Sequence, residues 1–201
     1  MDVRRTSPAL TVEQKLDVVT LATAKAQARV SHAAEDVLIT SYIAAAFDFL
    51  TGPAGWLVNF SLLREQFALY LAAPCPRAGV ELPRRPFADD VAPTVEARQA
   101  DGTYLPVNGG LFDVVGGDVY WRIVPTGTWP ATGNSPLAYR ITFSAGFAAA
   151  QDVPEPFRQA IRLLVAEFYE NRSASTDALR PQALFGVRAL IGGYRLAKDH
   201  S

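Results

Sequence analysis

The chain has 201 residues, of which 49% are hydrophobic and 19% are charged, and its formal net charge at pH 7 is −1. This composition is typical of a globular protein and argues against a disordered chain. The near-neutral charge argues against a stable duplex-DNA binder, which normally carries a basic surplus or a basic stripe. The length indicates one domain, or one domain carrying a sub-domain, that can bury a core without disulfides or metals.

Cys75 is the only cysteine, so an intrachain disulfide cannot form and a reducing compartment is the default expectation. Residues 1–18 carry charges and no continuous apolar stretch, which argues against a secretory signal. No apolar run approaches the roughly 20 residues of a membrane span. We therefore expect synthesis in the cytoplasm and no membrane partner.

The N-terminal third predicts two helices. Residues 1–19 form an extension with no strong signal beyond a short extended stretch at 17–20. Thr20 can cap a helix over 21–29, whose alternating alanines give high helix propensity. A second helix is predicted over 33–50 and ends at a Gly-Pro-Ala-Gly turn.

The helix over 33–50 carries a wide apolar face. Ile39 and Ile43 share one stripe, and Leu38 and Tyr42 open an adjacent one. Either the helix is buried between two partners in its own core, or another subunit covers part of the face. The second interpretation makes Tyr42 a candidate interface residue.

The middle third changes to strand patterns separated by turns. Strand candidates lie about ten residues apart, a spacing typical of antiparallel sheets, at 64–71, 94–99, 111–115, 119–124 and 139–144. Asp-Gly, Asn-Gly-Gly and Gly-Gly-Asp sequences between them are turn signals. We expect a small antiparallel sheet or half-barrel covered by Trp121 and Trp129, rather than a parallel doubly wound sheet.

The segment from Asp152 to Arg172 predicts a long amphipathic helix. Asp152 and Glu155 fit a capping box, and the first helical turn tolerates the two neighbouring prolines. Apolar residues at helical spacing are predicted to be interior, namely Phe157, Ile161, Leu164, Val165 and Phe168. The basic residues off this stripe are expected to be exposed or to meet a neighbouring subunit, namely Arg158, Arg162 and Arg172.

These patterns predict an α+β fold. Two N-terminal helices and long C-terminal helices form a bundle, into which a small antiparallel β sub-domain is inserted. The expected organisation is an N-terminal extension at 1–19, a helical core at 20–55 plus 148–195, a β insertion at 56–147 and a tail at 196–201.

No residue pattern supports catalysis, a metal site or a cofactor. His32 and His200 lack ligands at metal-binding spacing, and Cys75 has no catalytic signature around it. Asp89 and Asp90 are paired only in sequence, and the Arg84–Arg85 pair is best interpreted as a solvated loop. We therefore expect no enzymatic activity and no cofactor.

Taken together, segments in four regions resemble the head–tail connector (adaptor) proteins of tailed phages and gene transfer agents. They lie in the same order as in that family: Leu21 to Val30 with Glu35 to Ile39 and Ile43 to Ala46; Glu81 to Arg84 with Pro86; Trp129-Pro130 with Tyr139 to Gly146; and Val153 to Pro156, Arg158 to Ile161 and Tyr169 to Arg172. The matches span about residues 20–195, and the last group is the most specific.

The resemblance implies a structural role in a virion or phage-like particle, at the head–tail junction. Such proteins form a homo-oligomeric ring, commonly a dodecamer, between the portal protein and a neck, stopper or tail terminator protein. The ring extends the DNA channel, and DNA passes through the lumen without sequence-specific binding. The protein would reside in the cytoplasm of the producing bacterium during assembly.

The resemblance also implies that the C-terminal segment engages the portal. The candidate interface residues are aromatic or basic, as interface hot spots usually are, and comprise Arg180, Phe185, Tyr194, Arg195 and Lys198 in addition to Tyr42, Arg158 and Arg162. The alternative is that Phe185 and Leu190 only complete the subunit's own core. The terminal residues could become ordered on binding.

Two further functions stay open from the sequence. One is another neck component, such as a stopper or tail-completion protein, although we expect those to be mainly β. The other is a small enzyme or ligand-binding module, which would need a deep pocket in the β region with convergent polar groups and a perturbed titratable residue.

Overall fold

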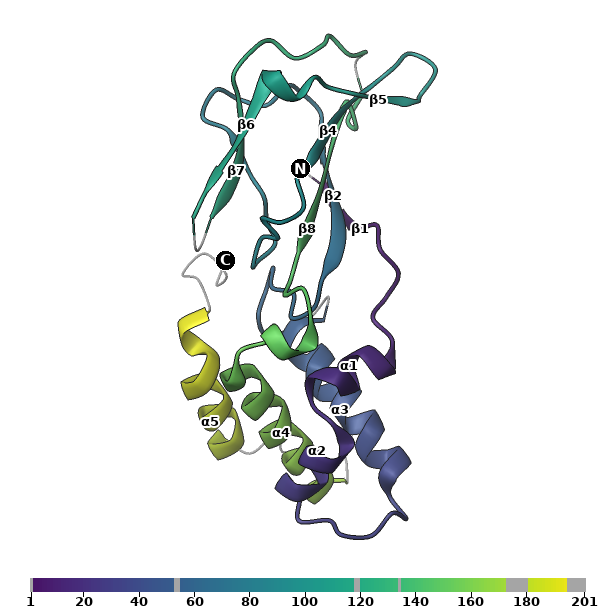
Figure 1. Cartoon of the computed structure of the whole chain (residues 1–201), viewed down its shortest axis with the longest axis vertical. Helices are drawn as coiled ribbons and strands as arrows, with labels where there is room; N and C mark the ends of the chain where they lie inside the picture. The colour runs from purple at the N-terminus through teal and green to yellow at the C-terminus, as the bar shows by residue number, and fades with distance from the viewer. Residues whose placement is uncertain (1, 53–54, 118–119, 134, 173–180, 195–201) are drawn as a thin grey trace. The chain divides into compact units, whose positions relative to one another are not determined.

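A computed structural model describes residues 2–52, 55–117, 120–133, 135–172 and 181–194 (Figure 1). The chain divides into two compact units, each built from two separate segments. One unit comprises Met1–Pro8 with Phe60–Ala148, and the other comprises Ala9–Asn59 with Ala149–Ser201. The first contains the strands and the second the α-helices, so the predicted α+β class is confirmed.

The larger sheet has five antiparallel strands in the order β1-β2-β8-β4-β5. These are β1 (Asp2–Arg5), β2 (Glu65–Leu71), β8 (Tyr139–Ala145), β4 (Thr94–Arg98) and β5 (Tyr104–Pro106). The central pair, β2 and β8, brings Phe67 opposite Phe143 and Leu69 opposite Ile141. Alternate residues on these strands are buried, as the period-two pattern predicted.

A second sheet has three strands in the order β3-β7-β6, with β3 (Val80–Glu81), β7 (Trp121–Pro125) and β6 (Phe112–Gly116). A short 3-10 turn, η1 (Gly109–Leu111), precedes β6. Residues of both sheets share one hydrophobic cluster. Trp129 is buried in this cluster, where its Nε1 donates to the Leu111 carbonyl at 3.1 Å, and Trp121 packs at its edge. The expected covering role of both tryptophans is confirmed.

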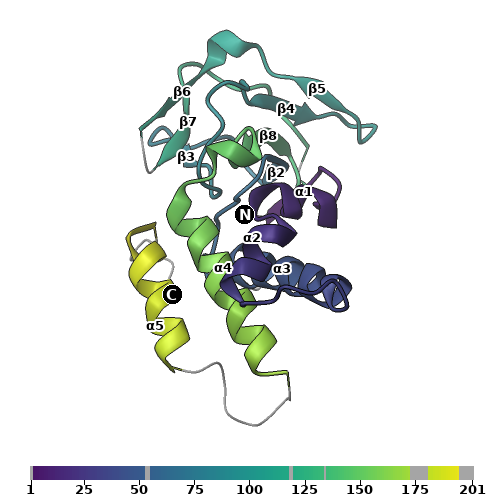
Figure 2. The same cartoon turned by 60° about the horizontal axis from the view of Figure 1, so that its bottom comes forward.

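The helical unit contains α1 (Val12–Val18), α2 (Leu21–Gln27), α3 (Asp36–Thr51), α4 (Glu155–Glu170) and α5 (Pro181–Ile191). Short 3-10 turns, η2 (Ala150–Asp152) and η3 (Gly192–Tyr194), precede α4 and follow α5. In this unit α4 is central, because it packs against α5 on one side and against α2 and α3 on the other (Figure 2). Its predicted stripe is buried at Phe157, Ile161, Leu164 and Val165, whereas Phe168 is only partly buried.

Two local predictions at helix starts are wrong. Residues 17–18 are not extended, because α1 runs from Val12 through Val18. Its N-cap is Thr11, whose hydroxyl and backbone form a capping box with Gln14. Asp152 and Glu155 do not form a capping box at α4. The Asp152 carboxylate instead accepts the backbone N–H of Ala149 at 3.0 Å and closes the η2 turn, and Pro154 is the N-cap of α4.

One glycine ends β8 in a conformation that other residues rarely adopt. Gly146 has φ +104°, and a Cβ atom added there would lie 2.0 Å from the Leu63 carbonyl oxygen. The adjacent Phe147 bridges Leu63, and the N–H of Gly146 donates to Pro86 at 2.8 Å. The glycine therefore allows two backbone segments to approach closely.

Candidate interaction surfaces

Tyr42, the candidate on α3, is half-buried within the helical unit. Its ring meets Phe168 of α4 edge-on, with 6.1 Å between the ring centroids. Ile39 and Ile43 of the same helix are fully buried, whereas Val37 is 87% exposed. The wide apolar face is thus covered mainly by the chain's own core, in line with the first of the two interpretations.

Arg158 and Arg162 were expected to be exposed or to meet another subunit. Both bond to residues of α4 or of the preceding η2 turn. The Arg158 guanidinium donates to the Ala150 carbonyl at 2.7 Å, and its side chain is only 25% exposed. The Arg162 side chain is 19% exposed, donates to Gln159 at 2.8 and 3.0 Å, and pairs with Glu155. Both side chains are therefore partly buried and bonded within the chain, although Nε of Arg158 is buried without a hydrogen-bond partner among the described residues. A contact of either arginine with another subunit stays a prediction.

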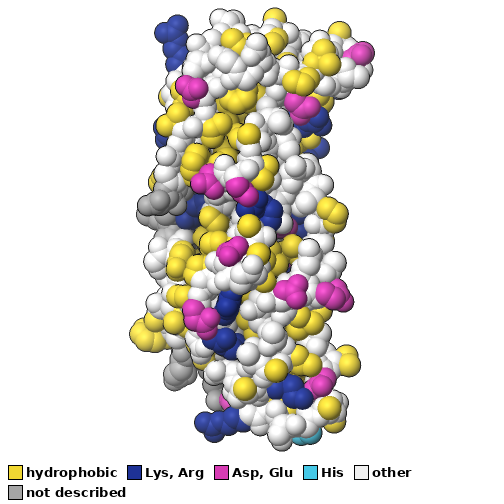
Figure 3. Space-filling model, in the orientation of Figure 1, with side chains coloured by type: hydrophobic (Ala, Val, Ile, Leu, Met, Phe, Trp, Pro, Cys, Tyr) yellow, Lys and Arg dark blue, Asp and Glu magenta, His cyan; other side chains and the backbone are white. Residues whose placement is uncertain are grey.

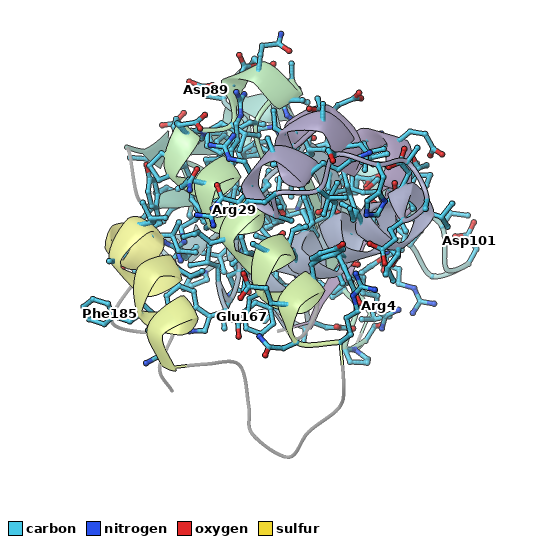
Figure 4. The ribbon with its side chains drawn as sticks, turned by 90° about the horizontal axis from the view of Figure 1, so that it is seen from below. Arg4, Arg29, Asp89, Asp101, Glu167 and Phe185 are labelled. Carbon is cyan, nitrogen blue, oxygen red and sulfur yellow. The ribbon has the colours of Figure 1, made fainter. Side chains whose placement is uncertain are left out.

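The C-terminal helix α5 has two different faces. Val187 and Ile191 are buried, and Tyr194 of η3 lies against Phe157 of α4 with 4.5 Å between the ring centroids. Phe185 is 74% exposed and points away from α4 (Figure 4). Leu190 is partly buried. Of the remaining candidates, Arg180, Arg195 and Lys198 lie outside the described residues.

A hollow on α2 was not anticipated from the sequence. It is open, has a volume of about 500 Å³, and is lined by Leu21, Ala22, Lys25, Ala26 and Val30. The Lys25 ammonium pairs with Asp36 at 2.5 Å, so its charge is balanced at the edge of an otherwise apolar surface. The helical spacing of the lining residues is the signal that could have revealed it, because positions i, i+1, i+4 and i+5 share one face.

A second unanticipated feature joins the start of α3 to the end of α4. Arg172 Nη1 donates to Glu35 Oε1 at 2.6 Å, and the Tyr169 hydroxyl donates to Oε2 of the same carboxylate. These two donors, Arg172 first, lower the pKa of Glu35 from 4.5 to about 2. Tyr169 and Arg172 belong to the Tyr-Glu-Asn-Arg segment that carried the most specific part of the family resemblance, and the structure gives that segment a role in packing.

The arginine pair at 84–85 is not a solvated loop pair, contrary to expectation. The Arg84 guanidinium lies 4.8 Å from the centroid of the Phe67 ring, and its Nε is buried without a hydrogen-bond partner among the described residues. Burial lowers the pKa of Arg84. Arg85 lies over the Phe60 ring at 5.9 Å. Packing on an aromatic face therefore replaces part of the solvation of Arg84, and Arg85 also lies over a ring.

The other residues considered for chemistry lie apart. Burial raises the pKa of the Cys75 thiol, which donates to the Ile123 carbonyl at 3.2 Å. Asp89 and Asp90 are both exposed, and Asp90 pairs with Arg64 at 3.0 Å, which lowers the pKa of Asp90. Among the described residues, no group of three or more His, Cys, Asp and Glu side chains could hold a metal ion.

The surface carries charges of both signs. Figure 3 shows acidic and basic side chains interspersed over one face of the molecule. Arg140 pairs with Glu96 at 2.6 Å, and Arg5 pairs with Glu65 at 3.0 Å. In the described part of the chain, none of the helices has the length and apolar character needed to cross a membrane.

Comparison with known proteins gives matches only among solved structures. No protein-family model matches the chain, and no curated protein matches it. A chain in the neck of an empty gene transfer agent particle, computed with C6 symmetry, is similar with a TM-score of 0.73 and 27% identity. The similarity covers 98% of this chain and 96% of that one.

Chains in two further structures of gene transfer agent particles are also similar. In each, the similarity covers 98% of this chain and 96% of the other chain. One is the virion of a native gene transfer agent particle, with a TM-score of 0.73 and 26% identity. The other is the neck of a native particle computed with C12 symmetry, with a TM-score of 0.70 and 25% identity. The likeness includes both units of the chain, so it supports a structural neck component of such a particle.

Proposed function

We propose that this chain is a head–tail connector (adaptor) subunit in the neck of a tailed phage or gene transfer agent. One observation carries the proposal: 27% identity and a TM-score of 0.73 over 98% of the chain to a neck component of a gene transfer agent particle. Several copies would form a ring between the portal protein and the next neck or tail component, and the ring would extend the DNA channel.

The symmetry of the similar structures supports a ring of identical subunits. Two of them are necks computed with C6 and with C12 symmetry. Cyclic symmetry of this order requires heterologous contacts, in which one surface of a subunit meets a different surface of its neighbour. A dodecamer, as implied by the family resemblance, is compatible with both symmetries.

The charge of the chain suits a channel protein through which DNA slides. Each Lys or Arg that neutralises a phosphate strengthens binding through counterion release. The formal net charge of −1 and the intramolecular pairing of arginines such as Arg162, Arg140 and Arg172 leave little surplus for gripping phosphates. The ring would accordingly surround DNA and show no sequence-specific affinity.

The adaptor role is favoured over that of a stopper by the helical unit. We expect stopper and tail-completion proteins to be mainly β, whereas here one of two compact units consists of helices α1 to α5. The similarity to neck chains covers this helical unit as well as the sheets. Among the described residues, no group of three or more His, Cys, Asp and Glu side chains could hold a metal ion for catalysis.

The test is to follow the full chain alone and with the portal protein encoded beside it. Native mass spectrometry should show a monomer or weak oligomers of the chain alone, and a closed ring bound to portal when the two are produced together. Electron microscopy of purified particles should place the ring directly against the portal. Absence of the chain from particles would overturn the proposal, and a position separated from the portal by another protein would favour the stopper role.

A further inference from the structure

The outer face of α5 is built to present an apolar anchor. Phe185 is 74% exposed, and Ala189, one helical turn later, is exposed beside it. The helix itself is held in place, because Val187 and Ile191 on its other face are buried against the unit's core. An anchor on a fixed helix loses little conformational freedom on binding, which favours association.

The hollow on α2 has the complementary chemistry. Leu21, Ala22 and Ala26 offer apolar walls, Val30 is buried at its base, and small side chains leave an open volume of about 500 Å³. The only charged lining residue, Lys25, is paired with Asp36 at 2.5 Å. An aromatic side chain, which buries about 150–250 Å² on docking, could enter without leaving a charge unpaired.

The two surfaces lie on different sides of the helical unit. Figures 2 and 4 show α4 between α5 and α2, with Phe185 directed away from α4. The anchor of a subunit therefore points away from that subunit's own hollow. Two complementary surfaces that face different directions on one subunit are what a head-to-tail contact requires, and repetition of that contact closes into a ring when the rotation permits.

We infer that the exposed face of α5, anchored by Phe185, docks into the α2 hollow of the neighbouring copy and forms part of the subunit contact of the ring, in place of the portal contact that the family resemblance implies for Phe185. The inference rests on the proposed ring, and the cyclic symmetry of the similar necks identifies a second copy as the occupant. The contact joins the helical units of two neighbouring copies.

Cysteine cross-linking of the full chain in portal-bound rings tests the contact directly. The double variant Ala22→Cys/Phe185→Cys should give, after mild oxidation, a ladder of covalent oligomers up to the ring size. Each single variant should give no covalent dimer with itself, because the contact is heterologous. A mixture of the two single variants should give dimers. Wild-type chain, whose only thiol is buried Cys75, is the control for adventitious disulfides.

Two substitutions test the same contact without introducing cysteines. One truncates the Phe185 side chain, and the other fills the α2 hollow. Phe185→Ala should weaken ring assembly at least about tenfold, as truncation of an interface anchor commonly does. Ala26→Arg, which places a charged side chain in the hollow, should have a similar effect. The matched control is Val37→Ala on α3, which truncates another exposed apolar residue outside both surfaces and should assemble like wild type.

The outcomes separate this inference from the proposed function. If the wild-type chain forms no ring in particles or with portal, the proposed function fails. If wild-type rings form, but the double variant gives no ladder and Phe185→Ala and Ala26→Arg assemble normally, the ring stands and the α5–α2 contact is overturned. Self-cross-linking of the Phe185→Cys variant alone would also overturn it, because a two-fold contact would then bring two α5 helices together.

Discussion

Glu35 and Arg172 form an ion pair between the start of α3 and the end of α4, with Nη1 and Oε1 2.6 Å apart. The residues are separated by 137 positions in the chain, and the Tyr169 hydroxyl donates to the other oxygen of the same carboxylate. The pair fixes the relation between two helices whose apolar faces form the core of the helical unit. It also makes the stability of that unit depend on pH.

The Glu35 carboxylate should stabilise the fold above its unfolded pKa and lose this effect in acid. Its pKa falls from 4.5 to about 2 in the folded chain, so the folded state binds fewer protons between these values. The stabilisation is complete above about pH 5 and disappears as the pH falls toward 2. Urea unfolding of wild type and Glu35→Gln from pH 2 to 7 should show a difference that shrinks across this window.

The control for this titration is Asp17→Asn, which neutralises an exposed carboxylate on α1 of the same unit. This variant measures how far the loss of an exposed negative charge away from the Glu35 contact changes the urea midpoint. A Glu35→Gln difference that stayed constant down to pH 2 would contradict the role of the ionised carboxylate.

Arg140 and Glu96 should be energetically coupled across β8 and β4. The two residues are register partners, and the guanidinium binds both carboxylate oxygens at 2.6 and 2.8 Å. Arg140 also lies over the Tyr104 ring at 4.4 Å. A double-mutant cycle with Arg140→Ala and Glu96→Gln should give a coupling of about 0.5–1 kcal/mol by chemical denaturation.

Arg140→Lys should recover only part of this coupling, because an ammonium group cannot form the planar two-point contact. Replacement of exposed Arg122 on β7 by alanine is the comparison, and it should change stability by less than about 0.5 kcal/mol. Additive effects of the Arg140 and Glu96 substitutions would show that the pair contributes nothing.

Gly146→Ala should destabilise the sheet unit by about 2 kcal/mol or more. The backbone has φ +104°, and the added Cβ would lie 2.0 Å from the Leu63 carbonyl oxygen, so a backbone segment would have to move. Gly109→Ala is the matched substitution, because a Cβ there meets no atom within 4 Å. Equal denaturation midpoints for the two variants would contradict the close approach.

Phe157 of α4 and Phe185 of α5 should differ sharply in their contribution to stability. Phe157 is fully buried against Tyr194, and its truncation to alanine should cost about 3–5 kcal/mol. Phe185 is 74% exposed, and its truncation should cost less than about 0.5 kcal/mol in the isolated chain. Urea unfolding of both variants checks this, and a large loss from Phe185→Ala would mean that α5 packs with its other face inward.

Cys75 should resist thiol reagents in the folded chain. The side chain is buried, its pKa is raised by that burial, and it donates to the Ile123 carbonyl at 3.2 Å. A chromogenic disulfide reagent should therefore react much more slowly in buffer than in denaturing urea. Fast labelling under native conditions would show that this part of the sheet unit opens readily.

The elements predicted correctly are those with strong periodicity. The stripes of α3 and α4 and the alternation in β2, β4 and β8 appear in the sequence because each element buries one face of its own. The missed elements lack that signal. Strand β1 consists of Asp-Val-Arg-Arg, and its place in the sheet depends on pairing with residues 67–70, far along the chain. Helix α1 has only seven residues.

The α+β class, the long amphipathic helices and the order of segments that resembles head–tail connectors could all be recognised from the amino-acid sequence, because periodicity and order are properties of the linear chain. Folding determines which charged side chains have bonding partners within the chain and which apolar side chains stay exposed. Arg158 and Arg162 find partners within their own helix and its approach, whereas Phe185 and the hollow around Ala22 remain open. Partners that lie far apart in sequence meet only after folding, so pairs such as Glu35 and Arg172 could not be recognised earlier.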